Sequence, residues 1–255
     1  FVLSGYSWPQ MGQLITQLPP VAKPVVQPKQ SAPALPAVSK EEQLACLTLQ
    51  AAGTAVTFNK QTGFVDYLDV EGQSLFESGC SLRPDFWRAP TDNDYGAGLQ
   101  QKLKVWKQPE MRLCSFEEQA LGASRQVKAA YDLPQADATL ALTYTLTPTG
   151  KLIVEQQLTV NPDAAQKPVL PRFGMTLVMP EQYGQIAYYG RGPVENYSDR
   201  HASAFLGYYE TDVKSQYWPY IRPQESGNHT DVRWWGVYDG ATGSGLKFYA
   251  PEPLE

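Results

Sequence analysis

The most regular pattern of apolar and polar positions lies between Thr139 and Val160. Apolar residues occupy every second position from Leu140 to Leu146, and threonine or alanine occupies the positions between them. A turn at Pro148–Gly150 leads into Leu152–Val160, where apolar residues again keep mainly to one face. Because side chains alternate between the two faces of a strand, this pattern predicts an antiparallel hairpin with one buried face.

Further segments along the chain are short, rich in β-branched or aromatic residues, and separated by turn-forming residues. Turns are predicted at Lys60–Gly63 and Glu71–Gln73, where glycine follows polar residues. The additional strands predicted from this pattern are Thr54–Asn59, Phe64–Val70, Arg172–Met179, Ile186–Tyr189, Phe205–Tyr209, Val232–Tyr238 and Leu246–Tyr249.

Helical spacing is scarce. Leu99, Leu103 and Trp106 recur at i, i+4 and i+7, which predicts one short helix that Pro109 would end. Because short strands dominate the remainder, the sequence predicts an all-β fold built as a large antiparallel sandwich.

Composition supports a sizeable core and narrows the range of partners. The chain has 255 residues, of which 42% are hydrophobic and 12% aromatic, enough for a large β domain. Its net charge is −5 and its basic residues form no block, which argues against nucleic acid and anionic membrane surfaces as partners. No stretch of about 18 apolar residues occurs, so no membrane-spanning helix is predicted.

The first part of the chain differs in composition from the rest. Residues 1–18 hold some apolar side chains but are too few to fold alone, and they are interpreted as the end of a preceding domain. Residues 19–43 form a predicted linker, because six prolines fall between Pro19 and Pro36 and favour extended polyproline II. A PxxP recognition motif is the functional alternative to a plain spacer. Residues 44–255 are predicted to form the folded domain.

The cysteines do not identify a compartment. Cys46, Cys80 and Cys114 are widely spaced and odd in number, which matches neither a disulfide framework nor a zinc site. Three separate buried thiols are predicted, with one bridge between two of them as the alternative. A soluble protein of the cytoplasm or periplasm is expected. The start at Phe1 is interpreted as that of a piece cut from a longer protein.

The stretch Asp85–Gly96 concentrates groups that bind and orient other groups. It places three aromatic rings, an arginine and several carboxylates within twelve residues, with Pro90 fixing the backbone. A turn is predicted at Thr91–Asp94, because Asp and Asn side chains bond to nearby main chain. Arg88 paired with a neighbouring carboxylate in a braced turn is the structural interpretation of this stretch.

Two later stretches have a similar character. Gly190–Arg200 and Tyr220–Trp234 both mix arginines, carboxylates, amides and aromatic rings at close spacing. One interpretation is a half-buried ion-pair network that braces turns. The other is a sugar-binding rim, because Arg, Asp and Asn bond vicinal hydroxyls while Tyr or Trp stacks on a sugar face.

The three stretches together resemble a known family. Phe86–Asp94 with Gly96, followed in order by the two later stretches, is similar to the C-terminal domain of the large β-galactosidases of glycoside hydrolase family 2. The resemblance extends from about Leu44 to Ala250 and does not include the proline-rich stretch.

The resemblance implies a fold and a function. It implies the super-sandwich shared with galactose mutarotases, with residues 1–18 ending an immunoglobulin-like domain and the super-sandwich stopping before its last strands. It implies a parent enzyme that hydrolyses terminal β-D-galactosyl bonds with retention, and a role for this domain in shaping the galactoside site. The catalytic glutamates, and the family's magnesium and sodium ligands, would lie in a separate catalytic barrel. No catalytic residue, metal ligand or cofactor is therefore expected in this chain. The expected partners are a β-galactoside or galactose and the barrel, and the parent could form an oligomer.

The residues expected at the edge of the substrate site are Arg88, Asp92, Asn93, Asp94 and Gly96. Gly96 and Gly98 are predicted to form a hinge for the loop that follows. Further candidates for sugar contact lie in the other two stretches: Arg191, Glu195, Asn196, Tyr197, Asp199, Arg200, Arg222, Gln224, Glu225, Asn228, Asp231, Arg233 and Trp234.

Two other functions remain as alternatives. The chain could be a stand-alone carbohydrate-binding module, without a barrel partner. It could also be a mutarotase-like aldose epimerase, in which His201 and His229 are the side chains suited to proton transfer near neutral pH.

Overall fold

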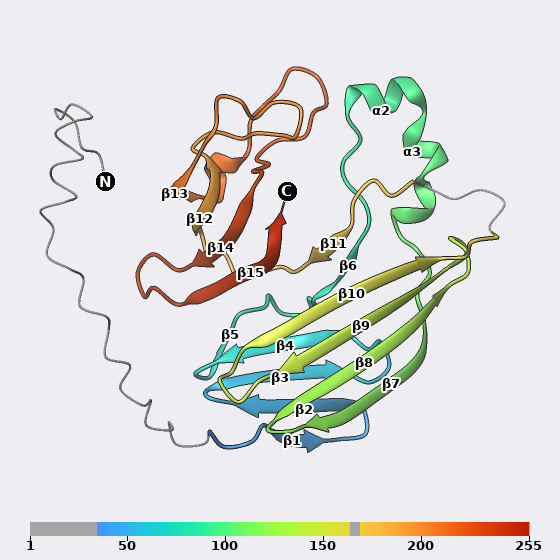
Figure 1. Cartoon of the computed structure of the whole chain (residues 1–255), viewed down its shortest axis with the longest axis vertical. Coiled ribbons are helices and arrows are strands. Elements are labelled where there is room, and N and C mark those ends of the chain that lie inside the picture. The colour runs from blue at the N-terminus through green and yellow to red at the C-terminus, as the bar shows by residue number, and fades with distance from the viewer. Residues whose placement is uncertain (1–34, 164–168, 255) are drawn as a thin grey trace, which may run out of the picture. The chain divides into compact units, whose positions relative to one another are not determined.

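Four antiparallel sheets make up the part of the chain that the computed structural model describes, residues 35–163 and 169–254 (Figure 1). The prediction of an all-β fold is confirmed. The kinship with galactose mutarotases stays a prediction. The predictions for residues 1–18 and for most of the proline-rich stretch lie outside the described residues.

The first sheet is a meander of five strands in chain order. Its strands are β1 (Ser39–Glu42), β2 (Cys46–Ala51), β3 (Thr54–Asn59), β4 (Val65–Val70) and β5 (Gln73–Ser74). The β1 strand lies within the predicted linker. Its pairing with β2 shows that residues 39–42 belong to the sheet instead of a spacer.

The second sheet has four strands in the order β10-β9-β8-β7. They are β7 (Arg112–Leu121), β8 (Ser124–Leu133), β9 (Ala138–Leu146) and β10 (Leu152–Val160). The hairpin of β9 and β10 confirms the prediction, with Leu152 opposite Leu146 and Val160 opposite Ala138. The sequence pattern had identified neither β7 nor β8.

A single hydrophobic cluster fills the space between these two sheets (Figure 1). Leu47, Val56 and Phe58 project into it from the first sheet, and the alternating side chains of β9 project into it from the second. The Phe58 and Tyr144 rings meet edge to face, with centroids 5.2 Å apart. Burial of each large apolar side chain contributes about 1.5–3 kcal/mol, which makes this cluster the main stabilising feature of the two sheets.

A helical segment follows the first sheet, and it corrects the prediction for the opening stretch. Thr91–Asp94 is not a turn but the start of helix α2 (Asp92–Ala97), which is followed by α3 (Leu99–Lys102) and the 3-10 turn η1 (Lys104–Trp106). The short helix predicted from Leu99, Leu103 and Trp106 is therefore present in part, as α3 and η1 with a break at Leu103. Trp106 is fully buried against Phe86, with ring centroids 5.4 Å apart.

A small sheet of two strands joins the opening stretch to a later one. It pairs β6 (Arg83–Asp85) with β11 (Gly174–Thr176). The predicted strand Arg172–Met179 is therefore only three residues long, because its outer residues have no strand partner among the described residues. Phe173 still stacks on Phe86, with centroids 6.1 Å apart.

The last sheet has the order β13-β12-β14-β15. Its strands are β12 (Gln185–Gly192), β13 (Phe205–Asp212), β14 (Val232–Tyr238) and β15 (Gly245–Leu254), with the 3-10 turn η2 (Lys214–Gln216) after β13. Each of these strands was predicted, and β12, β13 and β15 are longer than the sequence pattern indicated. The loop between β13 and β14 carries the third of the chemically rich stretches.

The cysteines differ from the prediction of buried thiols. All three lie among the described residues and none is bridged, but Cys46 and Cys80 are half-buried and Cys114 is exposed. Within residues 35–163 and 169–254, no helix has the length and the hydropathy needed to cross a bilayer.

Candidate functional site

The start of α2 is held by a reciprocal pair of hydrogen bonds. The Thr91 hydroxyl accepts from the Asp94 backbone N–H, and the Asp94 carboxylate accepts from the Thr91 backbone N–H at 2.8 Å. This capping box satisfies two N–H groups that would otherwise lack partners, and it explains why Thr-x-x-Asp begins a helix here. The backbone from Pro90 into the helix is therefore firmly set.

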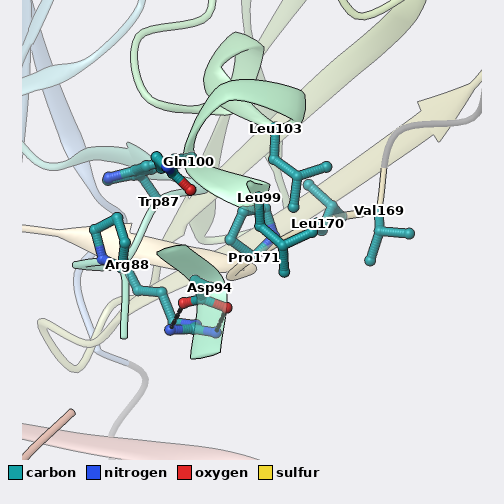
Figure 2. A pocket seen from close by; sticks show the side chains of 10 residues that line it. Trp87, Arg88, Asp94, Leu99, Gln100, Leu103, Val169, Leu170 and Pro171 are labelled. Atoms are coloured by element: carbon teal, nitrogen blue, oxygen red, sulfur yellow. Dashed lines mark hydrogen bonds and ion pairs between the residues drawn. The ribbon is translucent and has the colours of Figure 1, made fainter. Parts of the chain in front are cut away.

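Arg88 and Asp94 are engaged with each other (Figure 2). The guanidinium reaches both oxygens of the carboxylate, at 2.7 Å from Nη1 to Oδ2 and 3.1 Å from Nη2 to Oδ1. Burial alone would raise the pKa of Asp94, but the Thr91 N–H and the Arg88 guanidinium hold that pKa below its ordinary value. The pair therefore braces the opening stretch and leaves little bonding capacity for a sugar.

A small pocket of about 160 Å³ lies beside this pair (Figure 2). Its walls include Trp87, Leu99, Leu103 and Pro171. The Gln100 side chain also lines it, and its buried oxygen has no hydrogen-bond partner among the described residues. The pocket is largely apolar, and its charged groups are already paired.

Asp92 and Asn93 differ from Arg88 and Asp94 because they are exposed. The Asp92 backbone N–H donates to the Pro223 carbonyl at 2.8 Å, and the Arg222 guanidinium lies 3.4 Å from both Asp92 carboxylate oxygens. These contacts join residues 130 positions apart. They bring the first and third chemically rich stretches to the same place.

An open groove of about 530 Å³ forms where these stretches meet. We call it the Trp218 groove; it is lined by Asp92, Asn93 and all seven residues from Trp218 to Gln224. The Trp218 side chain is 63% exposed. Among the residues expected at a substrate-site edge, Asp92 and Asn93 line this groove, Arg88 and Asp94 line the smaller pocket, and Gly96 lines neither.

Of the two glycines in the predicted hinge, Gly96 lies inside α2 and only Gly98 has a positive φ, at 69°. A Cβ at Gly96 would meet nothing within 4 Å. Gly98 ends α2 in the left-handed conformation that glycine adopts most easily. The backbone break therefore lies at Gly98.

Glu195, from the second stretch, anchors the loop that forms the groove. Its Oε1 accepts from the Tyr220 hydroxyl and from Arg200 at 2.9 Å, while its Oε2 accepts from the Gly227 backbone N–H at 2.8 Å. Arg200 also lies over the Tyr197 ring, 5.2 Å from its centroid. Contacts from Glu195 in the second stretch therefore hold Tyr220 and Gly227 of the third stretch in place.

Asn196 is buried in the same region, and its side chain hydrogen-bonds to both neighbouring segments of the chain. Its amide donates to the carbonyls of Arg191 and Val194, both at 3.0 Å. Its oxygen accepts from the backbone and hydroxyl of Thr230, at 2.9 and 2.7 Å. With only 1% of its surface exposed and its amide fully used, Asn196 has a structural role.

Arg191 and Asp231 form a further brace. The Arg191 Nε lies 2.5 Å from Asp231 Oδ2, and its Nη1 donates to the Ala204 carbonyl at 3.0 Å. The hydrogen bond from Arg191 lowers the pKa of Asp231. Arg233 donates to the Asp231 carbonyl at 2.6 Å. The interpretation of the second stretch as an ion-pair network is therefore supported by these contacts.

The two histidines are not arranged alike. In His229, Nδ1 lies 3.1 Å from the Arg191 carbonyl oxygen and Nε2 lies 3.0 Å from the Gln216 side-chain oxygen. Burial lowers the pKa of His229, against an opposing effect of the Arg191 carbonyl and Glu195. In His201, Nδ1 is buried and has no partner among the described residues. His229 is thus fully engaged within the fold.

The remaining candidates lie around the groove or away from it. Arg172, which the sequence analysis did not single out, lies 2.7 Å from Glu225 and 4.0 Å from Asp85, and so links the third stretch to the first. Trp234 lies on β14 beneath the Lys247 ammonium, 3.6 Å from its ring centroid. Asn228 donates to the Asn196 carbonyl, and Asp199 is exposed. Within the described ranges, no group of three or more His, Cys, Asp or Glu residues is placed to hold a metal ion.

Comparison with known proteins adds an independent observation. Residues 50–252 match the family described as Beta galactosidase small chain. The chain is 36% identical over 204 residues to a beta-galactosidase of Priestia megaterium, covering 78% of this chain and 19% of that protein. It is 39% identical over 207 residues to a beta-galactosidase of Lactobacillus delbrueckii subsp. bulgaricus, covering 80% of this chain and 20% of that protein. The chain therefore spans about a fifth of the length of these relatives.

Proposed function

Because the chain belongs to the β-galactosidase small-chain family, we propose that it is the small-chain part of a glycoside hydrolase that removes terminal β-D-galactosyl groups. The resemblance of its three stretches to glycoside hydrolase family 2 extends the proposal to hydrolysis with retention of configuration. The names of the relatives support the substrate class.

Within such an enzyme, we propose that this chain packs beside the catalytic domain and shapes the mouth of the galactoside site. The observation that carries this role is the contact of Asp92 with Arg222 and Pro223. It joins two of the three stretches that resemble the family into one preformed face. Polar side chains on a rigid face are suited to position a substrate that another domain cleaves.

The chemistry of hydrolysis is assigned to the catalytic domain. A retaining glycosidase needs an acid whose pKa is raised, beside a second, ionised carboxylate. Burial acts to raise the pKa of Asp94 and Glu118, but their cationic and N–H neighbours lower it overall. Hydrogen bonds lower the pKa of Asp231 and Asp239. These four carboxylates therefore do not match the general acid. The chain alone is expected to be inactive because the resemblance places both catalytic glutamates in a separate barrel.

The magnesium and sodium ions implied by the resemblance are also assigned elsewhere. The described residues bring together no group of three or more His, Cys, Asp or Glu side chains. A bound divalent cation needs several oxygen ligands close together, and these side chains do not supply such a group. No step of the proposal therefore passes through a metal ion held by this chain.

An epimerase is the less favoured alternative. It would need a histidine free to exchange a proton with the sugar. Both ring nitrogens of His229 lie within hydrogen-bond distance of protein oxygens, and His201, whose Nδ1 has no partner among the described residues, lines neither the Trp218 groove nor the smaller pocket. A stand-alone carbohydrate-binding module is compatible with the Trp218 groove. A stand-alone module differs from the proposed function because no catalytic domain would accompany the chain.

The activity is tested by comparing two proteins. The complete gene product that contains this sequence should hydrolyse an aryl β-galactoside, with NMR showing a β-anomer as first product. The 255-residue chain should not. Absence of galactoside hydrolysis by the complete product would overturn the proposal. So would turnover by the 255-residue chain that is lost when one of its own carboxylates is replaced.

The site-shaping role is tested by Asp92→Ala in the complete product. We expect KM for β-galactosides to rise with a smaller change in kcat, because positioning is lost while the reacting groups remain. Glu117→Ala, which changes an exposed carboxylate on β7, is the matched control and should leave both constants unchanged. Equal kinetics of the two variants would remove the site-shaping role and leave the family assignment intact.

A further inference from the structure

We propose that the Trp218 groove binds a pyranose ring directly, through an aromatic platform and a set of free polar side chains. The inference deepens the proposed function and rests on it for the identity of the sugar, a β-galactoside. It assigns a binding subsite and involves no bond-breaking step. Nothing in the groove needs to titrate or to hold a metal ion.

The aromatic platform is Trp218. Its side chain is 63% exposed and makes no ring contact with another aromatic residue in the described part of the chain. An exposed indole presents a flat apolar face and an N–H donor on a side chain with only two rotatable bonds. The C–H face of a pyranose is a surface of matching shape and polarity.

Four polar side chains, of three chemical kinds, border the same groove. Asp92 and Arg222 approach each other at 3.4 Å, a contact longer than a strong charged hydrogen bond, so both retain bonding capacity. Asn93 and Gln224 make no side-chain hydrogen bond to any residue that the structure describes. A carboxylate, a guanidinium and two amides provide both acceptors and donors for neighbouring hydroxyls.

Contacts within the chain hold the groove in shape. Tyr220 is fixed by Glu195, and its backbone N–H donates to the Trp218 carbonyl at 2.9 Å. The Asp92 N–H fixes Pro223, and Arg172 holds Glu225 at 2.7 Å. Pro219 and Pro223 restrict the backbone further. A site that is already ordered loses less conformational freedom on binding.

Its size and composition favour a sugar over a protein surface. A volume of about 530 Å³ falls within the range of small-ligand sites. Protein interfaces place charged residues at their rim and deplete them at the centre. In this groove the charged and amide side chains line the same hollow as the tryptophan, which is an arrangement suited to binding hydroxyls.

The test is a titration of the 255-residue chain with methyl β-galactoside, followed by saturation-transfer NMR and by tryptophan fluorescence. We expect a single weak site, with Kd on the order of millimolar. Trp218→Ala should weaken binding roughly tenfold or more, and Arg222→Ala and Gln224→Ala by smaller factors. Tyr249→Ala, which removes an aromatic ring of similar exposure (69%) on β15, is the control and should bind like the parent chain. Thermal melts confirm that each variant is folded.

Each outcome has a separate meaning. Saturation transfer that is absent, or that is unchanged in both Trp218→Ala and Arg222→Ala, would overturn the sugar site. If Trp218→Ala instead weakens the association of the chain with its catalytic domain and leaves the titration unchanged, the groove is a protein interface and the proposal is also overturned. Galactoside hydrolysis by the complete gene product is scored independently. An active enzyme with no sugar bound to this groove would reject the inference and retain the proposed function.

Discussion

The two facing sheets β1–β5 and β7–β10 differ from the last sheet, β13-β12-β14-β15, in what stabilises them. The facing sheets enclose a dry cluster of large side chains, among them Leu47, Phe58 and Tyr144. The last sheet buries few apolar residues, such as Tyr188 and Val232, and its loops are joined by amides and ion pairs. The comparison indicates that the first region is a scaffold stabilised mainly by apolar burial, whereas the second is stabilised to a larger extent by hydrogen bonds and ion pairs.

Exposed large apolar side chains occur in both regions. Leu44, Tyr67, Leu121 and Ile153 are exposed in or beside the facing sheets, and Phe205, Tyr208, Trp218, Ile221 and Tyr249 are exposed in the last sheet and its loops. Singly exposed apolar side chains are common on protein surfaces, so exposure alone does not separate the two regions.

The largest expected difference comes from equal truncations in the two regions. Leu142→Ala removes a side chain with no exposed surface from the scaffold and should lower the free energy of unfolding by about 2–5 kcal/mol. Leu206→Ala removes the same atoms from a β13 position that is 44% exposed and should cost well under about 2 kcal/mol. Urea unfolding measures both. Equal costs would show that the last sheet contains a core comparable to that of the scaffold.

The polar bracing of the second region is tested next. Asn196→Ala removes the side-chain partner of the Thr230 N–H and of the Val194 carbonyl, and one of two polar neighbours of the Arg191 carbonyl, so it should cost about 1–3 kcal/mol despite the loss of only a few atoms. The exposed Asn93→Ala is the control and should change stability by less than about 0.5 kcal/mol. A similar, small effect of the two substitutions would contradict the bracing role of Asn196.

The Arg88–Asp94 ion pair should make the stability of the fold depend on pH. The pKa of Asp94 is lowered in the folded chain, so its contribution is complete above its unfolded pKa of about 3.9 and is lost as pH falls through the folded value. Asp94→Ala should therefore destabilise at pH 7, and the difference from the parent should shrink below about pH 4. Thermal melts from pH 7 to pH 2 measure this. A difference that stays constant across the range would show that the Arg88–Asp94 pair contributes nothing through charge.

The smallest expected effects come from the two glycines of α2, and they have opposite signs. Gly98 has φ 69°, so Gly98→Ala should cost about 1 kcal/mol. Gly96 lies within the helix with open space around it, so Gly96→Ala should stabilise by about 0.5–1 kcal/mol. Matched melting curves of the two variants test the placement of the backbone break. Destabilisation by Gly96→Ala would show that the hinge includes Gly96 as well as Gly98.

Strands were predicted more completely in the last sheet than in the scaffold, because all four strands β12–β15 were predicted whereas β7 and β8 were not. The alternation from Leu140 to Leu146 predicted β9 well, because burial of one face imposes a strict period of two. The same signal is present at Val127, Ala129, Tyr131 and Leu133 in β8, and applying it there would have found that strand. At Arg172–Met179 the alternation of residue types overstated the strand, because only Gly174–Thr176 pairs with a neighbouring strand and burial does not alternate across the segment.

The binding surface was only partly predictable. The Thr91-x-x-Asp94 spacing is a capping-box signal, and it explains why a helix forms where a turn was predicted. The candidates predicted from the sequence include Asp92, Asn93, Arg222 and Gln224 but not Trp218, which lies just before the third stretch, and the grouping of these residues was not predicted. Asp92 meets Arg222 only through the tertiary fold, and no local pattern encodes a contact across 130 positions.

Native-state amide hydrogen exchange of the 255-residue chain tests the division into scaffold and braced surface most directly. The amides of β8 and β9 should exchange only through global unfolding, whereas those of β12 and β14 should exchange through a local opening of lower free energy. In Asn196→Ala, exchange of β12 and β14 should accelerate while β8 and β9 are little changed. Equal protection of the two regions in the parent chain, or an equal acceleration of both in the variant, would contradict the account.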